Sequence, residues 1–111
     1  MIVREIVERL GLRVLAGEEA LGREVSGGYV ADLLSCVMAG AQPDQLWFTL
    51  QTHLNIVAVA ALAEVAAVVI TENAPIAAET VKRAAQEGVI LLSSPDPTFE
   101  TVVKLAKLGY A

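Results

Sequence analysis

The sequence predicts a layered α/β/α domain with a small, mainly parallel sheet flanked by helices. The first observation is a strand–helix–strand unit over residues 46–73. Residues 47–50 have the aromatic and β-branched composition of a strand, and residues 67–71 form the short apolar run of a strand buried on both faces. Because a helix of average length, residues 54–65, separates these strands, we expect them to be parallel with a right-handed crossover. The second observation is that strands and helices alternate from Arg23 onward, which is the order typical of an α/β fold.

The elements before this unit follow from side-chain spacing and turn residues. The first residues carry apolar side chains at helical spacing with charged residues opposite, and Gly11 suits the end of that helix. Cys36 lies in an apolar helical stretch and is expected to be a small core residue. In chain order we expect a helix over residues 2–10, strands over residues 12–16 and 23–26, and a helix over residues 30–39.

The elements after the unit are marked by prolines. Pro75 and Pro97 suit the first turns of two further helices, and Asp96 suits the N-cap of the second. In that second helix we expect Phe99 to face the core, together with the apolar residues that follow it. We expect a helix over residues 76–87, a strand over residues 89–92 and a last helix over residues 98–108.

The helix over residues 54–65 is apolar on nearly every side, with only Asn55 and Glu64 strongly polar. A helix of this kind must be covered on more than one side. Either neighbouring helices of its own domain cover it, or a second subunit does. We favour the subunit interface, because a domain of 111 residues has few helices with which to surround another. A membrane span is not expected, since the apolar run is shorter than a bilayer requires.

Length and charge bound the protein class. The 111 residues are expected to form one domain, residues 1–111. The formal net charge of −5 argues against non-specific binding to nucleic acid and against docking to an anionic membrane. With Cys36 the single cysteine and no signal peptide evident, we expect a cytoplasmic protein. Glu79 lies four residues before Arg83, a spacing that favours a surface ion pair.

Polar residues gather where the predicted strands end, while the elements themselves are strongly apolar. In open α/β sheets, ligands bind beyond the carboxyl ends of the strands where the strand order reverses. This pattern is typical of a small-ligand site, and the glycine pair after the second predicted strand is suited to backbone contacts with an anion. The alternative is that these residues only cap helices and form turns. The candidate ligand residues are Ser26, Gly27, Gly28, Gln51, Thr52, His53, Thr71, Glu72, Asn73 and Ser93.

No catalytic or metal-binding motif accompanies these residues. His53 is the single histidine, so a transition-metal site is not expected, and no cofactor is expected either. A Ser26–His53–Asp32 triad lacks the nucleophile-elbow pattern, and nothing in its spacing brings the three residues together. Glu72 has the chemistry of a general acid or base, although a lone loop carboxylate is usually solvated.

Three segments carry a resemblance to a known family. REVSGGYVADLL (residues 23–34), LWFTLQTHLN (residues 46–55) and ITE (residues 70–72) resemble the DRTGG domain, and the resemblance extends from the first helix to Leu108. The naming pentapeptide is not literally present: Arg23 and the Gly27–Gly28 pair match it, and Ser26 stands where a threonine is expected. The resemblance implies an α/β fold similar to the N-terminal domains of HPr kinase and of Mur ligases. It also implies a non-catalytic regulatory or interaction module, which occurs alone or attached to CBS domains or phosphotransacetylase-like enzymes.

Three functions are therefore weighed. The favoured one is a regulatory domain that self-associates, as a homodimer, and senses a small ligand such as a nucleotide or phosphorylated metabolite at the strand ends. The second is a protein–protein interaction adaptor without a ligand. The third and least favoured is a small enzyme with His53 and Glu72 as acid and base.

Overall fold

The protein folds into three layers, with helices on both faces of one central sheet. The computed structural model describes residues 1–110. The strands are β1 (Arg13–Ala16), β2 (Gly27–Val30), β3 (Gln45–Thr49), β4 (Ala67–Ile70) and β5 (Leu91–Ser93). The α-helices are α1 (Val3–Leu10), α2 (Leu34–Gly40), α3 (Asn55–Ala63), α4 (Ala78–Glu87) and α5 (Thr98–Leu105).

The strand order in the sheet is β1-β5-β4-β3-β2. Strands β2 to β5 are parallel, and β1 pairs antiparallel with β5. The predicted α/β/α class with a mainly parallel sheet is therefore confirmed. From β2 to β5 each strand lies beside the one before it, so the order of these parallel strands never reverses. The crevice expected at such a reversal is consequently not formed between them, which corrects one premise of the predicted ligand site.

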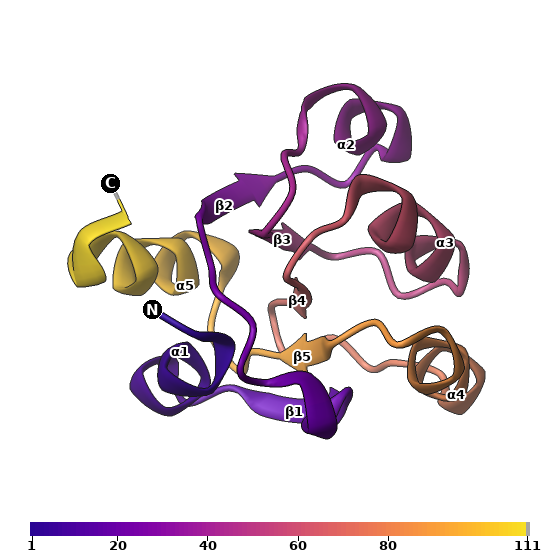
Figure 1. Ribbon diagram of the computed structural model, residues 1–111, viewed down its shortest axis with the longest axis horizontal. Coiled ribbons are helices and arrows are strands. Elements are labelled where there is room, and N and C mark those ends of the chain that lie inside the picture. Colours follow the sequence, from indigo (N-terminus) through magenta and orange to yellow (C-terminus); the bar gives the residue numbers. More distant parts are fainter. Residues whose placement is uncertain (111) are drawn as a thin grey trace.

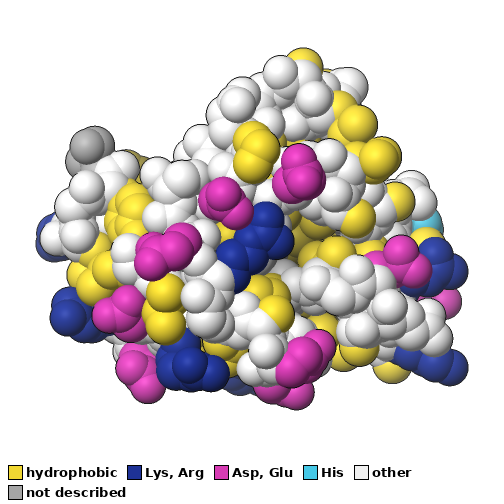
Figure 2. All heavy atoms as spheres, in the orientation of Figure 1, with side chains coloured by type: hydrophobic (Ala, Val, Ile, Leu, Met, Phe, Trp, Pro, Cys, Tyr) yellow, Lys and Arg dark blue, Asp and Glu magenta, His cyan; other side chains and the backbone are white. Residues whose placement is uncertain are grey.

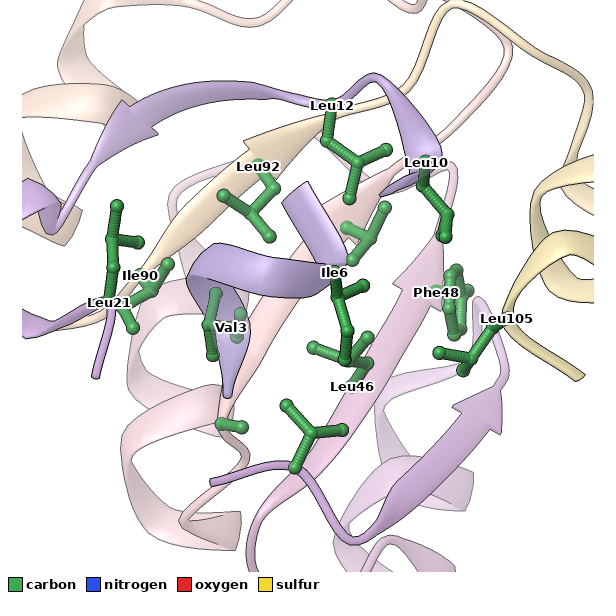
Figure 3. Packing of buried hydrophobic residues seen from close by; sticks show 14 residues of the cluster. Val3, Ile6, Leu10, Leu12, Leu21, Leu46, Phe48, Ile90, Leu92 and Leu105 are labelled. Carbon is green, nitrogen blue, oxygen red and sulfur yellow. The ribbon is translucent and has the colours of Figure 1, made fainter. Parts of the chain in front are cut away.

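Two apolar clusters separate the layers. Figure 1 shows α1 and α5 on one face of the sheet and α2, α3 and α4 on the other. Because side chains alternate along a strand, Leu46 and Phe48 of β3 point toward α1 and α5, whereas Trp47 between them points toward α2 and α3. Figure 3 shows Ile6 and Leu105 meeting Leu46 and Phe48 in the first cluster.

The second strand lies later in the chain than predicted. The strand expected over residues 23–26 is wrong, because Arg23 to Ser26 contributes only one isolated bridge, between Ile2 and Glu24. The strand instead begins at Gly27, and α2 begins at Leu34 rather than at residue 30. Within α2, Cys36 is exposed, so its predicted place in the core is wrong. Packing explains the glycine: a Cβ on Gly28 would lie 3.1 Å from Phe48 and 3.2 Å from Leu105. Gly28 is therefore a strand residue, and a glycine is needed there because α5 approaches closely, not because the chain turns.

The predicted prolines and the inward Phe99 also need correction. Pro75 lies three residues before the first residue of α4, outside its first turn, and Pro97 is itself the N-cap of α5. Phe99 is 78% exposed. The buried stripe of α5 comprises Thr101 and Leu105. Because helical residues two apart point in nearly opposite directions, Phe99 faces solvent.

Helix α3 lies between α2 and α4, and both contact it. Its buried residues, Ile56, Val57 and Ala60, face the sheet. Leu62 remains 71% exposed, and Ala58 and Ala61 are also exposed. The sheet and the neighbouring helices thus cover one side of α3, its other side stays exposed, and the subunit interface stays a prediction. None of the helices described is both long enough and apolar enough to cross a bilayer.

Candidate functional site

The carboxyl edge of the parallel strands brings most of the predicted site residues to one side of the sheet. Residues 51–53 follow β3, residues 71–73 follow β4, and Ser93 ends β5. Because β3, β4 and β5 are parallel, these segments share an edge. Gly27 and Gly28 instead begin β2 and Ser26 precedes it, so these three lie at the amino edge. Their predicted place in a ligand loop beside the other candidates is therefore wrong.

The segment after β4 is held by contacts within the protein. Glu72 and Asn73 both adopt left-handed backbone conformations, with φ of 64° and 50°. The Glu72 amide donates to Asp96 O at 2.9 Å, and the Asn73 amide donates to Ser94 O at 3.0 Å. The buried Thr71 hydroxyl lies 2.5 Å from the Thr98 hydroxyl. These contacts fit the alternative that the three residues form turns and caps, and their role in ligand binding stays a prediction.

Glu72 caps α5. The N-cap residue of this helix, Pro97, has no side-chain acceptor, so the first helical amides need another partner. The Glu72 carboxylate supplies it, accepting a hydrogen bond from the Thr98 amide at 2.8 Å. A carboxylate at a helix N-terminus is also favoured by the helix dipole. The Glu72 carboxylate thus has a structural role, as the acceptor that caps α5.

Asp32 organises the loop after β3, although it was not among the ligand residues predicted from the sequence. Its carboxylate accepts hydrogen bonds from the Thr49 hydroxyl at 3.0 Å and the Leu50 amide at 2.8 Å. The Gln51 side-chain amide donates to Asp32 O at 3.1 Å. Recognising β2 as a strand would have placed Asp32 just beyond its carboxyl end. The Ser26 hydroxyl binds Pro43 O at the opposite edge, so Ser26 and Asp32 do not form a triad with His53.

His53 is exposed at the start of α3. Its Nδ1 accepts a hydrogen bond from the Asn55 amide at 3.1 Å, which orients the ring and leaves Nε2 directed away from that contact. The preceding carbonyl, Thr52 O, accepts a hydrogen bond from the buried Thr80 hydroxyl at 2.8 Å. That bond ties the first turn of α4 to the loop after β3, so the imidazole sits on a fixed loop.

A shallow pocket of about 230 Å³ lies beside this loop, between the start of α3 and α4. It is lined by Leu54, Glu79, Lys82, Arg83 and Gln86. The predicted ion pair between Glu79 and Arg83 is not formed. Within residues 1–110, neither Lys82 nor Arg83 makes an ion pair. Figure 2 shows the histidine at the right edge of the molecule, where both basic and acidic side chains lie near it.

Lys82 and Arg83 were not among the candidate ligand residues predicted from the sequence. The available signal was two adjacent cations in a chain of net charge −5. The packing of α4 against α3 brings this pair and Leu54 around one hollow, which the spacing of residues along the sequence does not indicate.

A second hollow, of about 260 Å³, lies at the amino edge near the middle of the face shown in Figure 2. Arg23 lines it, but its guanidinium is already bound, to Asp44 Oδ1 at 3.0 Å and to Glu64 O at 2.7 Å. The other charged residues at its wall are Glu64 and Glu87. Among the residues described, no three side chains of His, Cys, Asp or Glu gather in a way that would hold a metal ion.

Comparisons with known proteins find a family and a fold. A family model for the DRTGG domain matches residues 5–108. No curated protein matches the sequence. Among solved structures, the chain is similar to the CBS and DRTGG domains of the regulatory region of Clostridium perfringens pyrophosphatase, crystallised with its activator diadenosine tetraphosphate. The similarity has a TM-score of 0.66 at 15% sequence identity, and covers 90% of this chain and 44% of that chain. This chain thus spans less than half of the length of that structure, and at this identity the likeness shows the fold alone.

Proposed function

The chain belongs to the DRTGG domain family, and from that premise we propose that it is a non-catalytic regulatory domain that senses a small anionic ligand. The ligand class is a nucleotide or phosphorylated metabolite. The observation that carries this proposal is the pocket beside α3 and α4. Two cations that make no ion pair within residues 1–110, Lys82 and Arg83, line it, and the loop that carries the exposed His53 lies beside it.

Charge supports an anion at this place in particular. The chain has 13 acidic residues against 8 basic ones, so a phosphate group is repelled by the protein as a whole. In the lining of this pocket Lys82 and Arg83 outnumber the one acidic residue, Glu79, so the local balance of charge is opposite to that of the whole chain. Arginine binds phosphate oxygens through two parallel hydrogen bonds, lysine binds them as a point charge, and the outward Nε2 of His53 adds a further donor.

The pyrophosphatase regulatory region of similar fold supports the choice of ligand class. Its crystals contain diadenosine tetraphosphate, an activator that carries four phosphates. The Leu54 side chain on the wall of this pocket offers an apolar surface suited to a base or sugar beside the cations. The pocket is shallow, so affinity would come mainly from the phosphate groups.

The proposal includes one domain over residues 1–111 that self-associates. Exposed apolar side chains support it, since Leu33, Leu62 and Phe99 are 64%, 71% and 78% exposed. The same exposure favours the second candidate, an adaptor that binds another protein and has no ligand. A ligand response at the α3–α4 pocket separates the two candidates.

The test is a thermal-shift titration with ATP, pyrophosphate and diadenosine tetraphosphate. At a ligand concentration of a hundred times Kd, binding adds about 2.7 kcal/mol to the unfolding free energy, which raises Tm by roughly ten degrees for a domain of this size. The double variant Lys82→Glu/Arg83→Glu should lose this rise.

The matched control is Arg9→Glu/Lys107→Glu. It makes the same change in net charge at exposed positions of α1 and the C-terminal turn, and should keep the rise. An equal rise in wild type and in Lys82→Glu/Arg83→Glu would place the ligand elsewhere. A flat titration with all three probes would remove the support for this ligand class and favour the adaptor.

A further inference from the structure

Strand β2 forms an open edge of the sheet. It pairs with β3 on one side, and the strand order ends with it on the other. The Ala31 amide donates to Phe48 O at the end of the ladder. Peptide groups alternate in direction along a strand, so Tyr29 and Ala31 point theirs toward β3, whereas Gly28 and Val30 point theirs outward. The outward groups are a template for another strand.

The two edges of the sheet differ in how they are protected. Edges are commonly blunted by charge, proline or a β-bulge. Strand β1 has two of these, the exposed Arg13 and a register shift between Val14 and Ala16. Strand β2, Gly27–Val30, carries neither charge nor proline, its register with β3 is regular, and Val30 is 53% exposed.

An apolar pocket accompanies the unprotected edge. It has a volume of about 100 Å³ and lies between β2 and α5, lined by Gly28, Val30, Phe48, Val102 and Leu105 among others. Gly28 cannot fill it from within, because a Cβ there would crowd Phe48 and Leu105. A side chain standing opposite Gly28 on a neighbouring strand would lie on the same face, next to this pocket.

We propose that β2 is a dimerisation edge, which pairs antiparallel with β2 of a second copy of this chain. The two-fold axis passes beside Tyr29, so that Gly28 of each copy stands opposite Val30 of the other. Each Val30 then fills the pocket that Gly28 leaves in its neighbour. The outward peptide groups of Gly28 and Val30 form the hydrogen-bonded pairs, and the two sheets join into one.

A second copy is the occupant because the edge is complementary to itself. It holds both the empty position, Gly28, and the exposed apolar side chain, Val30, two residues apart, and antiparallel pairing about Tyr29 brings one onto the other. No carboxylate lies within β2, so no two of them face each other across the paired strands. An interface in which each copy presents the same patch is the usual form of a homodimer.

The proposal deepens the self-association in the proposed function and does not involve the α3–α4 pocket. Sedimentation velocity of the purified protein from micromolar to millimolar concentration tests it. Wild type should dimerise, and Val30→Lys, which places a charge in the pocket, should be monomeric throughout. Leu62→Lys is the matched control on the exposed side of α3 and should still dimerise. Circular dichroism and Tm show whether both variants fold.

The register has its own test. In the proposed pairing Gly27 stands opposite Ala31 of the second copy in a non-hydrogen-bonded pair, where Cα atoms lie about 4.5 Å apart, within reach of a disulfide. The variant Gly27→Cys/Ala31→Cys, made in a Cys36→Ser background, should oxidise to a covalent dimer. A Cβ at Gly27 meets only the Gln45 side chain, at 3.9 Å, so the variant should fold.

Three results would overturn the proposal: a monomeric wild type, a Val30→Lys protein that dimerises like wild type, or a dimer without the disulfide. If Leu62→Lys is monomeric and Val30→Lys is not, α3 is the interface instead. The ligand titration on Val30→Lys keeps the two ideas separate. If the protein is monomeric but shows the full ligand-induced rise in Tm, the dimer proposal fails and the sensing site stands. If it dimerises through β2 but shows no rise in Tm, the sensing site fails and the dimer proposal stands.

Discussion

Glu72 provides a sharp test of how the carboxyl edge is built. Its carboxylate accepts the Thr98 amide at 2.8 Å, and Pro97 offers no substitute. Removing a side-chain cap costs about 1 kcal/mol, within a range of roughly 0.5–2. Alanine does not relieve the left-handed backbone at this position, where φ is 64°, so Glu72→Ala should lose the cap without a compensating gain.

The expected change in melting temperature follows from the chain length. At about 2.1 cal/mol/K per residue, a chain of 111 residues unfolds with an entropy of about 0.23 kcal/mol/K. A loss of about 1 kcal/mol therefore lowers Tm by about 4 °C. Glu72→Gln keeps a neutral acceptor and loses only the charge at the helix N-terminus, about 0.3–1 kcal/mol, so its Tm should lie between those of wild type and Glu72→Ala.

Differential scanning calorimetry measures these shifts, with Glu100→Ala as the matched control. Glu100 lies in the first turn of the same helix but makes no side-chain hydrogen bond within the described chain, so its loss should cost less than that of Glu72. If Glu72→Ala melts with wild type, or no lower than Glu100→Ala, the cap does not stabilise α5. The carboxylate would then be available for chemistry, as the enzyme hypothesis requires.

Three further substitutions test the core, the contacts of Arg23 at the amino edge of the sheet, and the C-terminal turn. Trp47 is fully buried and its indole donates to a backbone carbonyl at 2.8 Å, so Trp47→Phe should cost about 2–3 kcal/mol in urea unfolding. An unchanged urea midpoint would mean that the indole hydrogen bond does not stabilise the protein. Arg23→Lys loses the two guanidinium hydrogen bonds to Asp44 and should lower the free energy of unfolding by about 1 kcal/mol in the same assay. An unchanged free energy of unfolding would mean that these bonds do not stabilise the segment around Asp44. Burial, and then Glu24, raises the pKa of Tyr110 above its ordinary value of 10.0. The stability from its neutral phenol is thus complete below pH 10.0 and is lost as pH rises through the folded-state pKa. Tyr110→Phe should flatten that part of the pH profile of Tm, and a profile that falls as steeply as wild type would assign the loss to other groups.

The parallel strands were predictable because their composition alone determines them. Residues 46–49 and 67–70 are buried on both faces, and a short, continuous apolar run of this kind is typical of a strand in a parallel sheet covered by helices. Strand β2 was not predictable in the same way. Two consecutive glycines are typical of a turn, and only the close approach of Phe48 and Leu105 makes Gly28 a strand residue. Tertiary packing, which the local sequence pattern does not show, determines that this segment is a strand.

The candidate site was predictable only in part, for the same reason. Parallel strands place Gln51, His53 and Glu72 at one edge, which the order of elements already implied. Which polar groups remain free depends on partners from distant segments: Glu72 binds an amide 26 residues away. Lys82 and Arg83 share a pocket with Leu54 because α4 packs beside α3, and the spacing of these residues along the chain does not reveal it.

The most direct test of the sensing site is an NMR titration of ¹⁵N-labelled protein with diadenosine tetraphosphate, with ATP in parallel. The account predicts that the largest shift changes fall on residues 52–56 and 79–86, around the α3–α4 pocket, and disappear in Lys82→Glu/Arg83→Glu. Shifts centred on the hollow at Arg23 and Gly88, or spectra unchanged at saturating ligand, would contradict the claim that this pocket senses an anionic ligand.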